Sequence, residues 1–224
     1  MIGNYLCTNF LKGIKKILAI LGILLLLFVG YIWFFYFRGK KNVHEGPKPV
    51  PMAVGKHSQA FNQNVDSILI AYYAMTEGFV NWDTTAVNKN AAGVKAALEN
   101  FRLDELQNDT AKDAQAIYAT SLDFLANSKN EATNISQNPL IDKKREGLNS
   151  LTDNLRNLLV TIHFDGQKIY YLESPTAFNE AYPGYWLSAK EEIRNPYFGT
   201  QDPKHKDAML GEGNSKGLVV KDIQ

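Results

Sequence analysis

Residues 139–164 read PLIDKKREGLNSLTDNLRNLLVTIHF, and this stretch sets the expectation for the fold. Its apolar residues recur at intervals of three and four, the spacing of one buried face of an amphipathic α-helix. Pro139 suits the first turn, where a backbone N–H would have no partner within the helix. We therefore predict a helix from about Pro139 to Phe164. Its core-facing residues are Ile141, Leu148, Leu151, Leu155, Leu158, Leu159 and Ile162.

Three preceding stretches show the same spacing. The first begins at the capping candidate Ser58 and stops near Gly78, and the second begins at Asp83, whose carboxylate can accept a free backbone N–H. The third follows Asn108-Asp109 and ends before Pro139, because a residue that precedes proline disfavours helical backbone. Short links force neighbouring helices to run in opposite directions. The prediction is an all-α fold, an antiparallel four-helix bundle with an aromatic-rich C-terminal strand and loop extension, preceded by one transmembrane helix.

The pattern changes after the turn signal Asp165-Gly166. Residues 168–172 predict a short strand, ordered loops should follow to Gly213, and residues 214–224 are expected to form a flexible tail. Two interpretations of the aromatic residues in this region stay open: they cover one end of the bundle, or they form a rim for a partner or ligand. Asn81-Trp82-Asp83 is a candidate to join them from the first interhelical turn. The aromatic residues are Tyr170, Tyr171, Phe178, Tyr182, Tyr185, Trp186, Tyr197 and Phe198.

The N-terminal part carries an uncharged run at residues 17–37. A helix of that length would cover roughly 30 Å, the thickness of the hydrocarbon core of a bilayer. We predict a transmembrane helix there, between a basic segment at residues 1–16 and a proline-rich linker at residues 38–56. The helical domain is expected at residues 57–213. The expected location is the inner membrane, as a single-pass protein with its soluble domain in the periplasm.

The charge and the cysteine content limit the functions and the crosslinks that the chain can have. Six of the 24 basic residues lie in residues 1–41, which hold no acidic residue, so the rest of the chain has 18 basic and 23 acidic residues. Such a domain is poorly suited to nucleic acid, whose binding depends on clustered Lys and Arg. Cys7 is the only cysteine, which excludes an intramolecular disulfide.

Residues that could carry chemistry are scattered. The four histidines include no pair at the i, i+4 spacing of a helical metal site. The charged run at residues 142–146 is typical of a solvated helix face. The sequence has no phosphate-binding glycine loop, no nucleophile elbow and no HExxH motif. We therefore predict no enzymatic activity, no catalytic residues and no cofactor.

The stretch from Tyr171 to Gly213 resembles the C-terminal signature of a bacterial domain of unknown function, number 3347. The resemblance implies a domain that is found alone behind a membrane anchor, or fused to membrane-fusion subunits of heavy-metal efflux systems. The segments that carry it are Ser174-Pro-Thr-Ala-Phe178, Gly184-Tyr-Trp-Leu-Ser188, Glu192-Ile-Arg-Asn-Pro-Tyr-Phe-Gly199, Met209-Leu-Gly-Glu-Gly213, His57-Ser-x-x-Phe61-Asn62 and Phe79-Val-Asn-Trp-Asp83.

The family pattern has Cys-Pro-Met-Ala where this chain has residues 174–177, and a Cys-Gly pair near Glu212-Gly213. Such sulfur ligands would suit Cu(I). This chain keeps Met209 of that set, with His205 four residues before it. The leading hypothesis is a non-enzymatic accessory or interaction module, anchored in the membrane and partnered with a protein of a metal-efflux system. The alternative is direct binding of copper or another metal through His205, Met209 and His57.

Overall fold

The computed structural model describes residues 22, 24–26, 28–31, 57–109, 112–178, 181–201 and 210–220. The chain divides into two units, Met1–Met52 and Ala53–Gln224. In the first unit the described residues are helical, and their large apolar side chains, such as Leu26 and Phe28, are exposed. The predicted basic segment at residues 1–16 and the predicted linker at residues 38–56 lie outside the described residues.

The structure contradicts the prediction of a transmembrane helix. Among the residues described, every helix is too short or too polar to cross a bilayer. Residues 22, 24–26 and 28–31 are the described part of the predicted span 17–37. An uncharged run indicates how long a helix could be. Whether the helix forms also depends on nucleation and on tertiary packing.

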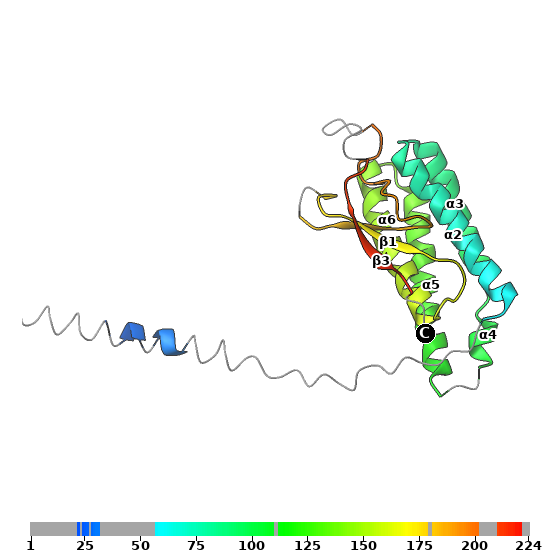
Figure 1. The fold of residues 1–224 in the computed structure, drawn as a ribbon, viewed down its shortest axis with the longest axis horizontal. Coiled ribbons are helices and arrows are strands. Elements are labelled where there is room, and N and C mark those ends of the chain that lie inside the picture. The colour runs from blue at the N-terminus through cyan, green and yellow to red at the C-terminus, as the bar shows by residue number, and fades with distance from the viewer. Residues whose placement is uncertain are drawn as a thin grey trace, which may run out of the picture. The chain divides into compact units, whose positions relative to one another are not determined.

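Four long helices form the body of the second unit (Figure 1). α2 is Gln59–Val80, α3 is Thr84–Asn100, α5 is Ala114–Gln137 and α6 is Ile141–Thr161. The two predicted caps are confirmed: Ser58 Oγ accepts the N–H of Phe61 at 3.2 Å, and Asp83 Oδ1 accepts the N–H of Ala86 at 2.9 Å. Pro139 lies before α6 rather than in its first turn, because Leu140 is the N-cap residue. The sequence did not predict the short helix α4, Asp104–Gln107.

The helices pack in chain order: α2 lies against α3, α3 against α5, and α5 against α6. Leu98, Leu148 and Leu151 in the core are fully buried, as the apolar spacing predicted. Between α2 and α6, Tyr72 of α2 reaches across and donates its hydroxyl to Oγ1 of Thr152 at 2.6 Å. Thr152 donates its own proton to the carbonyl of Leu148.

A three-stranded antiparallel sheet lies on the α6 side of the helices (Figure 1). Its strands are β1, Tyr170–Ser174, β2, Gly184–Ser188, and β3, Asn214–Leu218, in the order β2-β1-β3. The prediction of an all-α fold with one strand is therefore wrong, and the tail expected from residue 214 onward begins with a paired strand. β3 is polar and forms through its pairing with β1, which local sequence preference does not reveal.

The outer edge of β2 is closed by helix side chains. The N–H of Tyr185 donates to Oδ1 of Asn149 at 2.8 Å, and the N–H of Leu187 donates to the hydroxyl of Tyr72 at 3.2 Å. A free strand edge presents unpaired backbone groups that promote aggregation, and these side chains take the place of a fourth strand. β2 is thereby fixed between α2 and α6.

Candidate functional site

The segment Asn195–Gly199 organises the aromatic end of the second unit. The buried Tyr197 hydroxyl donates to the carbonyl of Tyr185 at 2.6 Å, and its ring meets Trp186 edge-on at 6.3 Å. Gly199 has a φ of 64°, and a Cβ there would lie 2.4 Å from the carbonyl oxygen of Val80. Only glycine fits this backbone without strain. The segment therefore binds the sheet on one side and the end of α2 on the other.

Trp82 joins this end from the turn between α2 and α3, as the sequence suggested. Its indole Nε1 donates to the carbonyl of Phe198 at 2.6 Å. The guanidinium of Arg145 lies over the ring, 4.6 Å from its centroid, in cation–π geometry. Trp82 holds a φ of 58°, which is uncommon for a bulky residue.

A second group of rings reaches solvent. Phe178 stacks on Tyr182 with 4.4 Å between centroids, and its edge meets the buried Tyr197 at 5.3 Å. Tyr182 is 46% exposed. Phe178 therefore supports this ring, while nearly half of the residue is open to solvent. Phe178 and Tyr182 are called the aromatic rim below.

A layered stack lies between α6 and the sheet. The rings of Tyr171 and Tyr185 are 5.0 Å apart and almost parallel, and the guanidinium of Arg156 covers Tyr171 at 4.7 Å. The Tyr171 hydroxyl donates to Asp153 at 3.4 Å, and that of Tyr185 to Glu173 at 3.1 Å. Burial raises the pKa of Asp153, against the opposing effects of Tyr171 and Arg156. These contacts attach the sheet to α6.

The polar side chains Ser174, Thr176, Asn195 and Glu212 form a partly buried clamp at the end of β1. The Asn195 amide donates to Oγ of Ser174 at 2.8 Å and to the carbonyl of Glu212 at 2.9 Å. Thr176 donates to the Glu212 carboxylate at 2.6 Å. Ser174 and Asn195 are completely buried, so these bonds replace the hydration both lose on folding. The clamp fastens the chain that enters β3 to β1.

The clamp brings together the positions that the resemblance links to sulfur ligands. Ser174, Thr176 and Glu212 supply oxygen in place of sulfur, and each takes part in a hydrogen bond within the clamp. Cu(I) selects thiolate and thioether donors. The clamp therefore does not fit a soft metal ion.

Of the predicted metal candidates, only His57 lies among the described residues. Both ring nitrogens of His57 face protein oxygens: Nδ1 lies 2.8 Å from Glu105 Oε1, and Nε2 lies 2.5 Å from the carbonyl oxygen of Ile162. His205 and Met209 lie outside the described residues. Within the described part of the chain, no three His, Cys, Asp or Glu side chains are grouped so that they could hold a metal ion.

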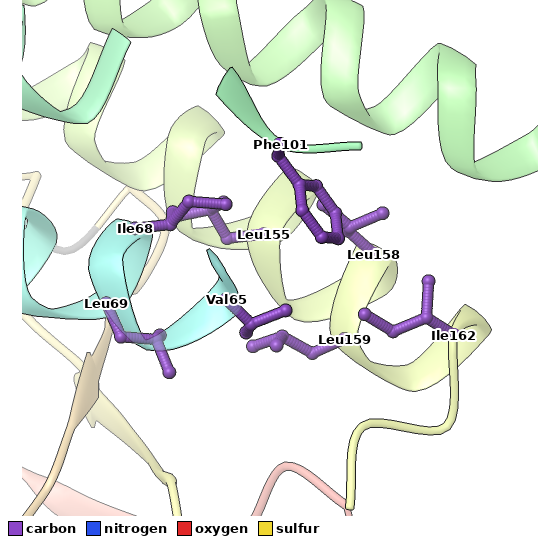
Figure 2. Close-up of a pocket in the computed structure, with 8 residues that line it drawn as sticks. All are labelled: Val65, Ile68, Leu69, Phe101, Leu155, Leu158, Leu159 and Ile162. Atoms are coloured by element: carbon purple, nitrogen blue, oxygen red, sulfur yellow. The ribbon is translucent and has the colours of Figure 1, made fainter. Parts of the chain in front are cut away.

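An internal cavity is too small for a metabolite. Its volume is about 10 Å³, and apolar side chains of α2 and α6 enclose it together with Phe101 (Figure 2). A water molecule in such a cavity would find no polar partner. The lining residues are Val65, Ile68, Leu69, Phe101, Leu155, Leu158, Leu159 and Ile162.

The sequence reasoning missed the polar face of α6. The run at residues 142–146 was expected to be solvated, yet Lys144 is 2% and Arg145 is 7% exposed. Arg145, Asn149, Thr152 and Arg156 recur at intervals of four and three, the spacing of a helix face. This face contacts Trp82, β2, Tyr72 and Tyr171. The same periodicity test, applied to polar residues, would have found it.

The second unit is thus a helical domain with a small antiparallel sheet. The polar side chains around the sheet mainly join elements of this unit to one another. No family model matches the chain, and no curated protein or solved structure matches it either. The resemblance to the domain of unknown function 3347 stays a prediction.

Proposed function

We propose that this chain is a non-enzymatic interaction module that contacts a protein partner through the aromatic rim. The observation that carries the proposal is Tyr182, a large ring that is 46% exposed and is stacked on Phe178. Binding energy at interfaces concentrates in a few aromatic and arginine side chains. A ring that is already fixed loses little conformational entropy when a partner covers it. The resemblance favours a partner in copper or heavy-metal handling.

The surroundings of Tyr182 support a protein partner over a small ligand. Phe178 is partly exposed, and the ring of Tyr182 lies at the surface rather than in a closed pocket. Lys143 and Glu146 form an exposed ion pair at 2.7 Å, and Lys143 is close enough to Tyr182 to interact with it electrostatically. An apolar centre with a charged, solvated border is the usual anatomy of a protein interface.

A photo-crosslinking amino acid placed at position 182 of the full chain tests this proposal. In cells that produce the chain, we expect one discrete crosslinked protein from position 182. Ile70 is the matched control, because it is 65% exposed on α2 and is not part of the rim. Adding Phe178→Ala should weaken the crosslink, since the ring loses its support. The same product from position 70, or no product from position 182, would contradict the proposal.

Direct metal binding is the second candidate function. The observation that favours it is the anchoring of Leu210, whose carbonyl accepts the N–H of Asn195 at 2.9 Å beside the clamp. Leu210 directly follows Met209 in the sequence, and His205 is five residues before it. The sequence segment that carries both candidate donors is thus followed directly by a fixed residue.

Titration of the full chain with Cu(I) and Cu(II) checks this alternative. Metal binding predicts one ion per chain, a higher unfolding midpoint, and loss of both effects in His205→Ala and Met209→Leu. His163→Ala is the control, because that residue lies at the far end of α6. No bound metal and no change in the midpoint would reject metal binding.

A further inference from the structure

The aromatic rim lies beside the first turn of α6, where a further apolar side chain is exposed. Leu140 is the N-cap residue of α6 and is 62% exposed. A helix places its N-cap residue next to its third residue, which here is Lys143. Lys143 is also close enough to Tyr182 to interact with it electrostatically. Two large apolar side chains, Leu140 and Tyr182, therefore lie beside the same lysine.

The charged groups of this surface include one base and one acid that pair with each other within α6. The Lys143 amine donates to both carboxylate oxygens of Glu146, at 2.8 and 2.7 Å, and the two side chains are 55% and 41% exposed. An exposed ion pair of this kind contributes little to stability, so each group can also pair with an opposite charge from outside. Asp142, which is next to Lys143 in the sequence, lies 3.5 Å from the guanidinium of Arg145. The surface thus offers both signs of charge next to an apolar centre.

This arrangement of charges limits the kind of partner that fits. A partner surface of one sign would place a like charge opposite either Lys143 or Glu146, which is unfavourable in an interface. A second copy of the chain, turned by a two-fold axis, avoids this conflict. The partner's Glu146 then faces Lys143, the partner's Lys143 faces Glu146, and the apolar side chains meet between them. Two-fold pairs are the commonest assemblies of identical chains, and they use one self-complementary surface.

We propose that the aromatic rim, together with Leu140, Lys143 and Glu146, is the interface between two copies of this chain. The inference rests on the proposed function and names the partner that the rim contacts. The surface is small, and small interfaces support only weak association. The chain should therefore pair at high local concentration and be monomeric in dilute solution.

Crosslinking between two differently tagged copies tests the pairing in cells. One copy carries a benzophenone amino acid at position 182, which keeps an aromatic ring there, and the other copy carries the second tag. We expect a product of twice the chain mass that contains both tags, and no such product from the control position 70. A product that holds a different protein in place of the second copy would overturn the pairing and leave the proposed function standing. No product at all would overturn both.

Charge reversal in the purified full chain tests the two-fold arrangement. Lys143→Glu makes both charges of the ion pair negative, and Glu146→Lys makes both positive. Each variant should bind itself at least about tenfold more weakly than the unchanged chain, because like charges meet across the axis. An equimolar mixture of the two variants should recover the association, since opposite charges then face each other. Sedimentation velocity over a range of concentrations measures these associations.

An ion pair on another helix supplies the matched control. Lys95 and Glu99 lie 3.4 Å apart on α3, and their side chains are 42% and 53% exposed. Lys95→Glu and Glu99→Lys should each leave self-association unchanged, whereas Tyr182→Ser should weaken it because the apolar centre is lost. All these side chains are exposed, so the variants should stay folded. A mixture of Lys143→Glu and Glu146→Lys that associates no better than either variant alone, or an equal effect of the α3 variants, would overturn the proposal.

Discussion

Lys144 is a lysine side chain enclosed by helices. Its amine on α6 donates to Oδ1 of Asn88 on α3 at 2.5 Å and to the carbonyl of Ile135 in the last turn of α5. Neither partner carries a full charge. The carbonyl belongs to the negative end of the α5 dipole, which attracts a cation. Burial lowers the pKa of this amine, so its charged form is costly to keep there.

Substitutions at Lys144 should separate the packing of its aliphatic stem from the charge of its amine. Lys144→Ala removes the stem and leaves the Ile135 carbonyl without its donor, and we expect a loss of about 2–4 kcal/mol in the free energy of unfolding. Lys144→Met keeps most of the volume and removes the desolvation cost of the charge. It should therefore lose no more than about 1–2 kcal/mol.

Urea unfolding of the full chain measures both values. Lys143→Met is the matched control, because its side chain is 55% exposed in an ion pair with Glu146. The control should leave the free energy of unfolding nearly unchanged, because the side chain lies at the surface. Equal losses in Lys144→Ala and Lys144→Met would mean that the amine, rather than the stem, supplies the stabilisation.

At the level of elements, apolar spacing predicted the long helices because each buries one continuous face. In α6, Leu148, Leu151 and Leu155 face the bundle and are no more than 2% exposed. Its second face was missed because Asn149 and Arg156 are polar residues that bind strands rather than solvent. A polar residue shows its type in the sequence, whereas its partner is fixed only by the fold.

The candidate site was predictable only in part for the same reason. The aromatic cluster and the place of Trp82 beside it followed from ring content and turn position. The clamp did not, since Asn195 meets residues 21 positions before it and 17 positions after it. His57 was selected for its chemistry as a ligand, but its distances to Glu105 and Ile162 are set by the meeting of three elements.

At the scale of the whole molecule, one ion pair joins α2 to the segment that follows β2. Glu77 lies on α2, and both of its oxygens accept hydrogen bonds from the guanidinium of Arg194. Arg194 lowers the pKa of Glu77 through these bonds, while partial burial opposes the shift. The two side chains are 47% and 41% exposed, so the pair contributes less than about 1 kcal/mol.

This shift gives the molecule a direction of pH dependence. A carboxylate whose pKa is lower in the folded chain stabilises the fold above its unfolded value of 4.5, and that stability is lost as the pH falls through the folded value. Glu105 acts in the same direction, whereas the raised pKa of Asp153 acts in the opposite one. The lowered pKa of His163 also makes the folded chain less stable as the pH falls, so we predict a lower unfolding midpoint at pH 3 than at pH 7.

Thermal unfolding of the Arg194→Gln variant isolates the contribution of this pair. The variant should lose about 2 °C of the unfolding midpoint at pH 7, the effect of somewhat less than 1 kcal/mol in a domain of this size. At pH 3, where a larger share of Glu77 is protonated than at pH 7, the difference should be smaller. Lys143→Gln breaks an ion pair within α6 alone and should change the midpoint less. A difference between Arg194→Gln and the unchanged chain that is the same at both pH values would show that Arg194 acts through packing and not through its charge.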